Sequence, residues 1–157
     1  MQLTPCFRTA TQSDAARVTL VYLTSRKTFV SFAPIAHSDE AVHSWIRDIL
    51  IPTGRVTVVE QAGKIVGMMA LSVDESNEAI GWIDHLYLLP EAVGHRIGTA
   101  LLNRAKSELG PPIRLYTFQA NVGARRFYER HGFKAIQYGN GSSNEEHCPD
   151  VLYEWSR

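Results

Sequence analysis

The stretch LYLLPEAVGHRIGTALL, residues 86–102, decides the fold of this chain. Its apolar run ends at Pro90, a loop with two glycines follows, and apolar residues then recur at helical spacing. The pattern predicts a buried strand over 79–89 and an amphipathic helix over 99–109, which Gly110 ends. A strand that turns through glycines into a helix is typical of mixed α/β domains.

Two helices are predicted before this stretch. The first runs over 15–27, with Thr11 or Ser13 as its N-cap, and one of its faces is apolar. The residues on that face are Ala15, Val18, Val21 and Tyr22. Pro34 cannot continue a helix, and Ser38 begins a second one. The second helix is expected to turn Val42, Trp45, Ile46 and Ile49 inward.

The other apolar and β-branched runs predict six more strands and one more helix. The strands are expected at 6–10, 55–61, 64–73, 113–119, 133–138 and 150–155, and the helix at 122–131. The order of elements is therefore β-αα-βββ-α-β-α-ββ, without an internal repeat or an inter-domain linker. These features predict a single mixed α/β domain over residues 1–157.

The composition excludes several classes of function. Sixteen Lys plus Arg balance sixteen Asp plus Glu, so the net charge offers no field to hold nucleic acid. The N-terminus lacks the pattern of a signal peptide, and the apolar runs fall short of the ~20 residues of a membrane-spanning helix. We therefore expect a cytoplasmic protein with no membrane or nucleic-acid partner. The six histidines form neither an HExxH nor a CxxC set, so no metal is expected.

A second segment, QANVGARRFYERHGF at residues 119–133, resembles one family's run of Asn, a small residue, an aromatic pair and Gly-Phe. Residues 86–102 resemble the same family's strand, Pro and Glu, and Q/R-x-x-G-x-G/A loop. The family is the GNAT superfamily of N-acetyltransferases. The resemblance implies a mixed, mostly antiparallel central sheet of about seven strands flanked by four helices. It also implies acetyl-coenzyme A as co-substrate, an amine as acceptor, and a possible homodimer.

The chain departs from the family pattern at two positions of the loop. Val93 stands where the family usually has Gln or Arg, and Arg96 replaces the first glycine of the pair. Glycine permits positive φ, so Arg96 indicates either a different loop conformation or a position that tolerates a side chain. The helix that follows still offers free N–H groups and its positive dipole end to a pyrophosphate.

The resemblance places the coenzyme along the end of the strand, over the loop, and beside the last helix. The candidate residues are Leu86, Tyr87, Leu88, Val93, Gly94, His95, Arg96, Ile97, Gly98, Thr99, Asn121 and Arg125. Leu86 and Leu88 are also suited to core packing, and Asn121 to capping the last helix. An exposed helical face without coenzyme contact is equally open for Arg125.

The resemblance also implies a general acid, because Tyr128 aligns with the tyrosine that faces the thioester sulfur in the family. Packing beside Phe127 is the alternative for this ring. The attacking amine must be neutral, so the site needs a base or a water chain, and Asp84 and His85 are the candidates. Adjacent strand residues point to opposite faces, so at most one of this pair should address the substrate. Glu60 is a third choice.

Acceptor recognition is expected from two segments outside the coenzyme motifs, residues 28–40 and 139–150. The candidate residues are Phe29, Phe32, His37, Glu145 and Glu146. The aromatic pair could form an apolar wall with the histidine at its rim, or could pack between the two helices. The glutamates offer negative charge to a cationic amine, or form a solvated acidic loop.

Three functions remain open from the sequence. They are an active N-acetyltransferase for a primary amine of a small molecule or peptide, a catalytically silent acyl-coenzyme A sensor, and a partner-binding module. Tyr128 favours the first, and the departures at Val93 and Arg96 leave room for the second. The neutral charge gives little support to the third. The fold does not specify the acceptor.

Overall fold

The computed structural model describes residues 4–157 and places seven strands in one sheet. The strands lie in the order β1-β2-β3-β4-β5-β7-β6, and neighbours are antiparallel except β4 and β5. Their bounds are Cys6–Thr9 (β1), Val56–Gln61 (β2), Lys64–Val73 (β3), Gly81–Leu88 (β4), Ile113–Phe118 (β5), Lys134–Tyr138 (β6) and Asp150–Trp155 (β7). The mixed, mostly antiparallel sheet expected from the resemblance is confirmed.

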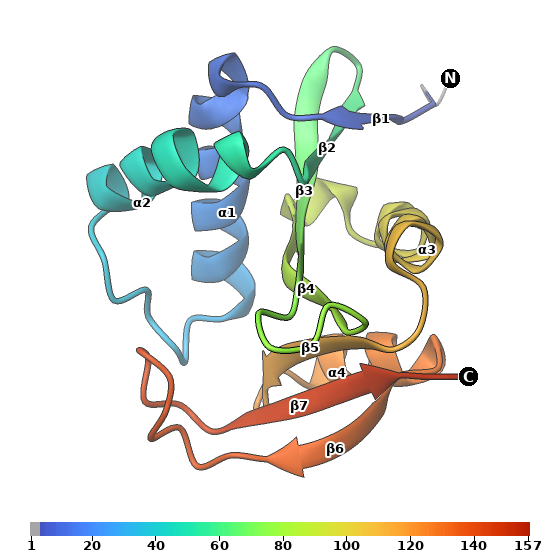
Figure 1. Ribbon diagram of the computed structural model, residues 1–157. Coiled ribbons are helices and arrows are strands. Elements are labelled where there is room, and N and C mark those ends of the chain that lie inside the picture. Colours follow the sequence, from blue (N-terminus) through green and yellow to red (C-terminus); the bar gives the residue numbers. More distant parts are fainter. Residues whose placement is uncertain (1–3) are drawn as a thin grey trace.

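Four α-helices cover the sheet: Ala15–Phe29 (α1), Asp39–Trp45 (α2), Ile97–Leu109 (α3) and Val122–Arg130 (α4). α1 and α2 lie on one side of β2–β4, α3 lies on the other side, and α4 lies behind β5 and β7 (Figure 1). Short helical turns precede α1, extend α2 and follow β4; their bounds are Gln12–Asp14, Ile46–Leu50, Ile51–Thr53 and Pro90–Ala92. No helix within residues 4–157 is long and apolar enough to cross a membrane.

α1 packs its apolar face against the sheet as the sequence predicts. Ala15, Val18, Val21 and Tyr22 are all buried, and the two valines are completely so. Burying a side chain of this size contributes roughly 1.5–3 kcal/mol. The helix is thereby fixed over β3 and β4.

α2 differs from the prediction because it continues into a π-helical turn at Ile46–Leu50. A π-turn closes i→i+5 bonds, so later residues move around the helix axis relative to an α-helix. Ile46 is fully buried as expected, whereas Ile49 is 62% exposed and Leu50 is buried in its place. The expectation that Ile49 faces inward is wrong, because it assumed an α-helical period throughout.

The sheet opens between β4 and β5. These parallel strands pair only through Gly81 with Ile113 and Trp82 with Arg114, both at the strand beginnings. β4 continues for six residues beyond Trp82, and β5 continues for four beyond Arg114, with no further pairing between them. The facing edges of both strands are therefore left without a strand partner at the centre of the sheet.

A bulge interrupts β4 beside this opening. Ala70 of β3 pairs with His85, but the next residue, Leu71, pairs with Ile83, so Asp84 has no partner in β3. A bulge inserts one residue, bends the strand and changes the direction of the side chains around it. The two predicted candidates for the base therefore sit at an irregular point of the strand.

Candidate active site

The opening between β4 and β5 holds a cavity of about 660 Å³. Its walls come from the later parts of β4 and β5, from the end of α1 on one face of the sheet, and from the start of α3 and the length of α4 on the other. Figure 1 shows where these elements lie. The cavity therefore reaches both faces. The predicted site residues that line it are Phe29, Asp84, His85, Leu86, Tyr87, Leu88, Val93, Gly94, Arg96, Gly98, Thr99, Asn121 and Tyr128.

The start of α3 presents unpaired backbone N–H groups to this cavity. The first intrahelical bond runs from the Ala100 N–H to the Arg96 carbonyl at 3.1 Å, so the preceding N–H groups lie outside the helical pattern. The N–H groups of residues 94–99 have no acceptor among residues 4–157. Gly94 has a φ of +86°, and a Cβ there would meet no atom within 4 Å. This combination suits a phosphate.

Arg96 keeps the backbone conformation that a glycine would adopt at this position. Its φ of 65° and ψ of 12° are left-handed, which costs an ordinary residue roughly 1–2 kcal/mol. Its side chain lines the cavity. Of the two interpretations of the departure from the family pattern, the structure supports a position that tolerates a side chain.

Three of the predicted coenzyme residues do not line the cavity. Ile97 is buried in the core, and His95 is exposed next to the loop glycine. The Arg125 guanidinium lies against β7, where its Nε donates to the Tyr153 hydroxyl at 3.0 Å. Arg130, at the other end of α4, lines the cavity. Arg130 was not among the candidates, because the sequence of an amphipathic helix does not show whether an arginine on it faces a cavity or solvent.

Asn121 caps α4 and lies at the cavity, so its predicted contact with the coenzyme stays a prediction. Its side-chain Oδ1 accepts a hydrogen bond from the Ala124 N–H at 3.2 Å and so caps α4. The residue also lines the cavity. Gly98 has a packing role as well, since a Cβ there would lie 3.4 Å from the Phe127 ring. α3 and α4 can therefore approach each other closely at the cavity wall.

Tyr128 is buried in the cavity wall, and its ring meets Phe127 and Phe133 edge-on, with centroids 5.2 and 5.7 Å away. Its hydroxyl makes no side-chain hydrogen bond among residues 4–157 and is not one of the fully buried polar atoms, so it is accessible from the cavity. Burial raises the pKa of this phenol well above its ordinary value, so the hydroxyl stays protonated. A protonated, unpaired donor at a cavity wall is suited to a developing negative charge.

Asp84 and His85 both line the cavity. Two features bring both of them to the cavity, and the expectation that at most one of them addresses the substrate stays a prediction. The bulge at Asp84 breaks the regular alternation of β4, and the cavity reaches both faces of the sheet. The two side chains nevertheless lie in different surroundings, which give them different chemistry.

His85 is enclosed by aromatic rings. Its ring centroid lies 5.6 Å from that of Tyr22, 5.3 Å from Trp45 and 5.8 Å from Tyr87. Burial, and then the positive charge of Arg26, lower the pKa of His85 to about 4. The imidazole is therefore neutral at pH 7 and only a weak base.

Asp84 is exposed in the cavity, and desolvation by the surrounding protein raises the pKa of its carboxyl, against a smaller opposing effect of the Ser72 hydroxyl. A raised pKa makes this carboxylate a better proton acceptor than an ordinary aspartate. Glu60, the third candidate, lies away from the cavity and accepts a hydrogen bond from Arg8 Nε at 3.0 Å.

The aromatic candidates for acceptor binding are not packed in the core. Phe29 and Phe32 are each 41% exposed, and Phe29 lines the cavity. Phe32 meets Phe118 of β5 edge-on, with centroids 6.1 Å apart. The segment after α1 thus lies beside the end of β5, on the face of the sheet opposite α3.

The charged candidates of the same region are paired with each other or with α1. His37 Nε2 lies 3.0 Å from Glu145 Oε2, and Arg26 Nη2 lies 3.4 Å from Glu146 Oε1. Neither glutamate lines the cavity. Glu146 therefore faces a cation of α1 and Glu145 contacts the His37 ring, and both pairs connect the 139–149 loop to α1 and the segment that follows it.

Three cavity residues on the α1 side were missed from the sequence. Arg26 follows Val18 and Tyr22 at four-residue spacing, so an arginine on an apolar helix face was a visible signal. Tyr116 and Phe118 alternate along β5, but the alternation does not show that the strand edge is open. Only the separation of β4 from β5 brings these residues into the site.

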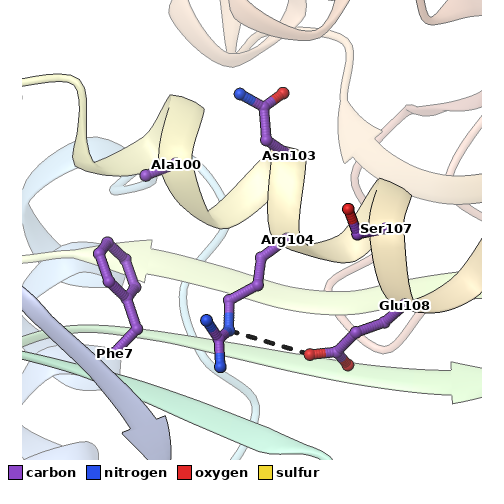
Figure 2. A pocket seen from close by; sticks show the side chains of 6 residues that line it. All are labelled: Phe7, Ala100, Asn103, Arg104, Ser107 and Glu108. Atoms are coloured by element: carbon purple, nitrogen blue, oxygen red, sulfur yellow. Dashed lines mark ion pairs between the residues drawn. The ribbon is translucent and has the colours of Figure 1, made fainter.

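A second hollow, of about 570 Å³, lies between α3 and β1 and is drawn in Figure 2. Arg104 Nε lies 3.8 Å from Glu108 Oε1, and its guanidinium lies 5.9 Å from the centre of the Phe7 ring. None of the predicted site residues lines this hollow.

No cluster of three or more His, Cys, Asp or Glu within residues 4–157 is placed to hold a metal ion.

The separation of β4 from β5 is where the family resemblance places the pantetheine arm, and this arrangement defines the fold as that of the acyl-coenzyme A N-acyltransferases. The family model described as "Acetyltransferase (GNAT) family" matches residues 22–133. The chain belongs to this family. No curated protein sequence matches the chain.

Solved structures share the fold over almost the whole chain. The apo form of YjaB from Escherichia coli has a TM-score of 0.76 at 18% identity, with 98% of each chain covered. PaiA N-acetyltransferase from Thermoplasma acidophilum, in complex with coenzyme A, has 0.74 at 20%, covering 99% of this chain and 100% of PaiA. Arabidopsis thaliana Naa50, with the bisubstrate analogue CoA-Ac-MVNAL, has 0.74 at 18% over the same shares.

Proposed function

We propose that this protein is an N-acetyltransferase that moves the acetyl group of acetyl-coenzyme A to a primary amine of a small molecule or peptide. The acceptor attacks directly while both substrates are bound. The observation that carries the proposal is the single cavity that reaches both faces of the sheet. A donor can enter it from the α3 side and an acceptor from the α1 side. The coenzyme A complex of PaiA and the bisubstrate complex of Naa50, on the same fold, support this assignment.

The α3 side provides what a coenzyme requires. The free N–H groups of the cavity-lining residues Gly94, Arg96, Gly98 and Thr99 would hold the pyrophosphate together with the positive end of the helix dipole, and Arg96 would add positive charge. The unpaired edge of β4 at Leu86 and Leu88 offers backbone donors and acceptors to the amides of the pantetheine arm. The coenzyme supplies an acetyl thioester, and the chain orients it.

The transfer itself requires one bond to form and one to break. The amine nitrogen bonds to the acetyl carbonyl carbon, and the carbon–sulfur bond breaks with its electron pair passing to sulfur. We assign Tyr128 as the hydrogen-bond donor to that sulfur, because its hydroxyl is protonated and unpaired in the cavity wall. We assign Asp84, rather than His85, to receive the proton of the amine, because the Asp84 carboxylate is exposed in the cavity and its pKa is raised, whereas His85 is enclosed by aromatic rings.

Acetyl transfer tests the proposal. Purified protein is incubated with acetyl-coenzyme A and a panel of primary amines, and free thiol is measured. We expect thiol release that depends on the amine, and a thermal midpoint that rises with acetyl-coenzyme A, since a ligand at a hundred times its Kd stabilises the fold by ~2.7 kcal/mol. Tyr128→Phe should lower kcat by about 10- to 1000-fold with little change in coenzyme affinity, because only the hydroxyl is removed.

Two results would contradict these assignments. If acetyl-coenzyme A raises the midpoint but no amine releases thiol, the protein is the silent acyl-coenzyme A sensor that the sequence left open. If Tyr128→Phe turns over at the wild-type rate under conditions where chemistry is rate-limiting, the tyrosine serves packing alone.

A further inference from the structure

Arg26 lies on the α1 side of the cavity, opposite the proposed coenzyme site. Its side chain is only 6% exposed. Arginine is almost never fully buried unless it is paired, because an uncompensated charge is costly to remove from water. The position of this arginine on the buried face of α1 therefore calls for a partner in the cavity.

The partners within the chain, which include the Tyr22 and Tyr87 side chains, leave one nitrogen of this guanidinium without an acceptor. Nη2 donates to the Ala33 carbonyl at 3.0 Å and lies 3.4 Å from Glu146 Oε1. Charge-assisted bonds of this kind are usually about 2.7–2.9 Å long, so the contact with Glu146 is a weak one. Nε is buried and has no hydrogen-bond partner among residues 4–157. A side chain with five N–H donors is left partly unsatisfied at the wall of the site.

The surroundings of Arg26 indicate the chemistry of that partner. The Arg26 Cζ atom lies 5.8 Å from the centre of the Phe118 ring, and Phe29 and Tyr116 line the same cavity with 41% and 59% of their surfaces exposed. The carboxylate of Asp84 lines it as well. One cation and one carboxylate among aromatic side chains complement a molecule that carries an amine, a carboxylate and an apolar group.

We propose that the acceptor is an amino acid with an apolar side chain, whose carboxylate binds Arg26 and whose amine faces Asp84. The proposal rests on the proposed function and names its substrate class. An incoming carboxylate would replace the long contact between Nη2 and Glu146, and it would also pair with Nε once the guanidinium turns toward the cavity. Peptide N-termini and simple polyamines carry no carboxylate beside the amine, so they would offer the Arg26 guanidinium no anionic acceptor.

Matched acids and amides test this. Phenylalanine and leucine are compared with phenylalaninamide and leucinamide as acceptors at saturating acetyl-coenzyme A. Rates are expressed per concentration of neutral amine, because the amides titrate at lower pH. We expect kcat/KM to be at least about 10-fold higher for each acid than for its amide, and Arg26→Gln to bring that ratio close to one.

Two variants separate recognition from structure. Arg17→Gln removes the same charge from the same helix, where Nη2 of Arg17 donates to the Ile65 carbonyl away from the cavity, and it should keep the wild-type ratio. Arg26→Lys keeps the charge but loses the planar fork, so its ratio should fall between those of wild type and Arg26→Gln.

A binding measurement completes the test without turnover. In the presence of coenzyme A, N-acetylphenylalanine should raise the thermal midpoint of the wild type more than N-acetylphenylalaninamide does, and this difference should vanish in Arg26→Gln. If Arg26→Gln does not fold and shows no melting transition, two other results test the proposal. They are the acid-to-amide ratio of kcat/KM in Arg26→Lys and the difference in thermal midpoint between the two N-acetyl compounds in the wild type.

The outcomes are distinguishable. Equal kcat/KM for acid and amide in the wild type, or a preference that survives in a folded Arg26→Gln, overturns the amino acid assignment and leaves acetyl transfer standing. Failure to acetylate any amine overturns the proposed function and this inference together.

Discussion

At the scale of single residues, Arg96 combines a backbone conformation suited to glycine with a charge that glycine lacks. Arg96→Gly removes the left-handed strain of the folded state, which costs roughly 1–2 kcal/mol. It also raises the conformational entropy of the unfolded chain, which lowers the free energy of unfolding by about 0.4–1 kcal/mol. We expect the free energy of unfolding, measured in urea, to rise by up to about 1 kcal/mol. The Kd for acetyl-coenzyme A, measured by calorimetry, should rise roughly 3- to 10-fold, because one cation is lost beside the phosphates.

Arg96→Ala separates the two effects of this change. It removes the charge but keeps a Cβ in the left-handed conformation, so it should weaken coenzyme binding without stabilising the fold. Coenzyme affinity equal to that of the wild type in both variants would mean that the Arg96 side chain does not contact the phosphates.

Asp84 and His85 lie in different surroundings of the cavity, and substitution tells their roles apart. Asp84→Asn removes the proposed proton acceptor and should lower kcat by about 100- to 10,000-fold. His85→Gln should lower it less, because the imidazole is a weak base with a pKa of about 4. The comparison is made by steady-state kinetics at saturating substrates. A larger loss in His85→Gln than in Asp84→Asn would reverse the assignment.

At the scale of elements, the start of β4 is packed so closely against α3 that it has no room for a side chain. A Cβ at Gly81 would lie 2.8 Å from Cδ1 and 2.9 Å from Cβ of Leu109. Gly81→Ala should therefore lower the free energy of unfolding by about 1–3 kcal/mol, as overpacking does in other cores. Urea denaturation measures the change.

Gly123→Ala serves as the control for this prediction. Gly123 lies in α4, and a Cβ there would meet no atom within 4 Å. The same substitution should be neutral, or stabilise by roughly 0.5–1 kcal/mol, because alanine favours a helix over glycine. If Gly81→Ala is as stable as this control, α3 can move away from β4 at little cost.

The elements also show where the sequence was sufficient. β3 and β7 match their predicted bounds to the residue, because β-branched runs ended by turn residues leave little choice of start and end. The inward face of α2 was mispredicted at Ile49, since a π-turn depends on packing rather than on local pattern. The bulge at Asp84 depends on the register of β4 against β3, which one strand alone does not encode.

The candidate site, like the elements, was predictable only where a local motif marks it. The loop before α3 and Tyr128 were predicted, because the glycine loop and the aromatic pair each lie within one short segment of the sequence. Arg26 and Phe118 reach the cavity from separate elements, and only the opening of the sheet brings them together. The local sequence marks Arg26 as a charge on an apolar helix face, but it does not show that Arg26 and Phe118 meet at one cavity.

At the scale of the whole molecule, burial of His85 should make stability depend on pH. Its pKa is about 4 in the folded protein and about 6.5 when unfolded, so between these values the unfolded chain binds more protons. The stabilising contribution is complete above pH 6.5 and is lost as the pH falls toward 4, by roughly 3 kcal/mol at most. Urea denaturation at several pH values measures it.

His85→Phe isolates this contribution. It keeps a ring among Tyr22, Trp45 and Tyr87 but removes the titrating group, so the fall in stability between pH 6.5 and 4 should become shallower. Asp84, with its raised pKa, acts in the opposite direction, and Asp14, with a pKa of about 2, acts only below pH 4. An unchanged pH profile in His85→Phe would show that His85 is protonated as easily in the folded protein as in the unfolded chain.

The two residue pairs that join β4 to β5 divide the sheet into a larger part, β1–β4, and a smaller part, β5–β7–β6. So narrow a junction allows each part to open to solvent separately, and amide hydrogens in β2–β3 and in β5–β7 should then exchange as two groups with different protection. A coenzyme lying along the unpaired edges would bridge them and slow exchange in both groups together. Substrate binding would then turn two cooperative units into one.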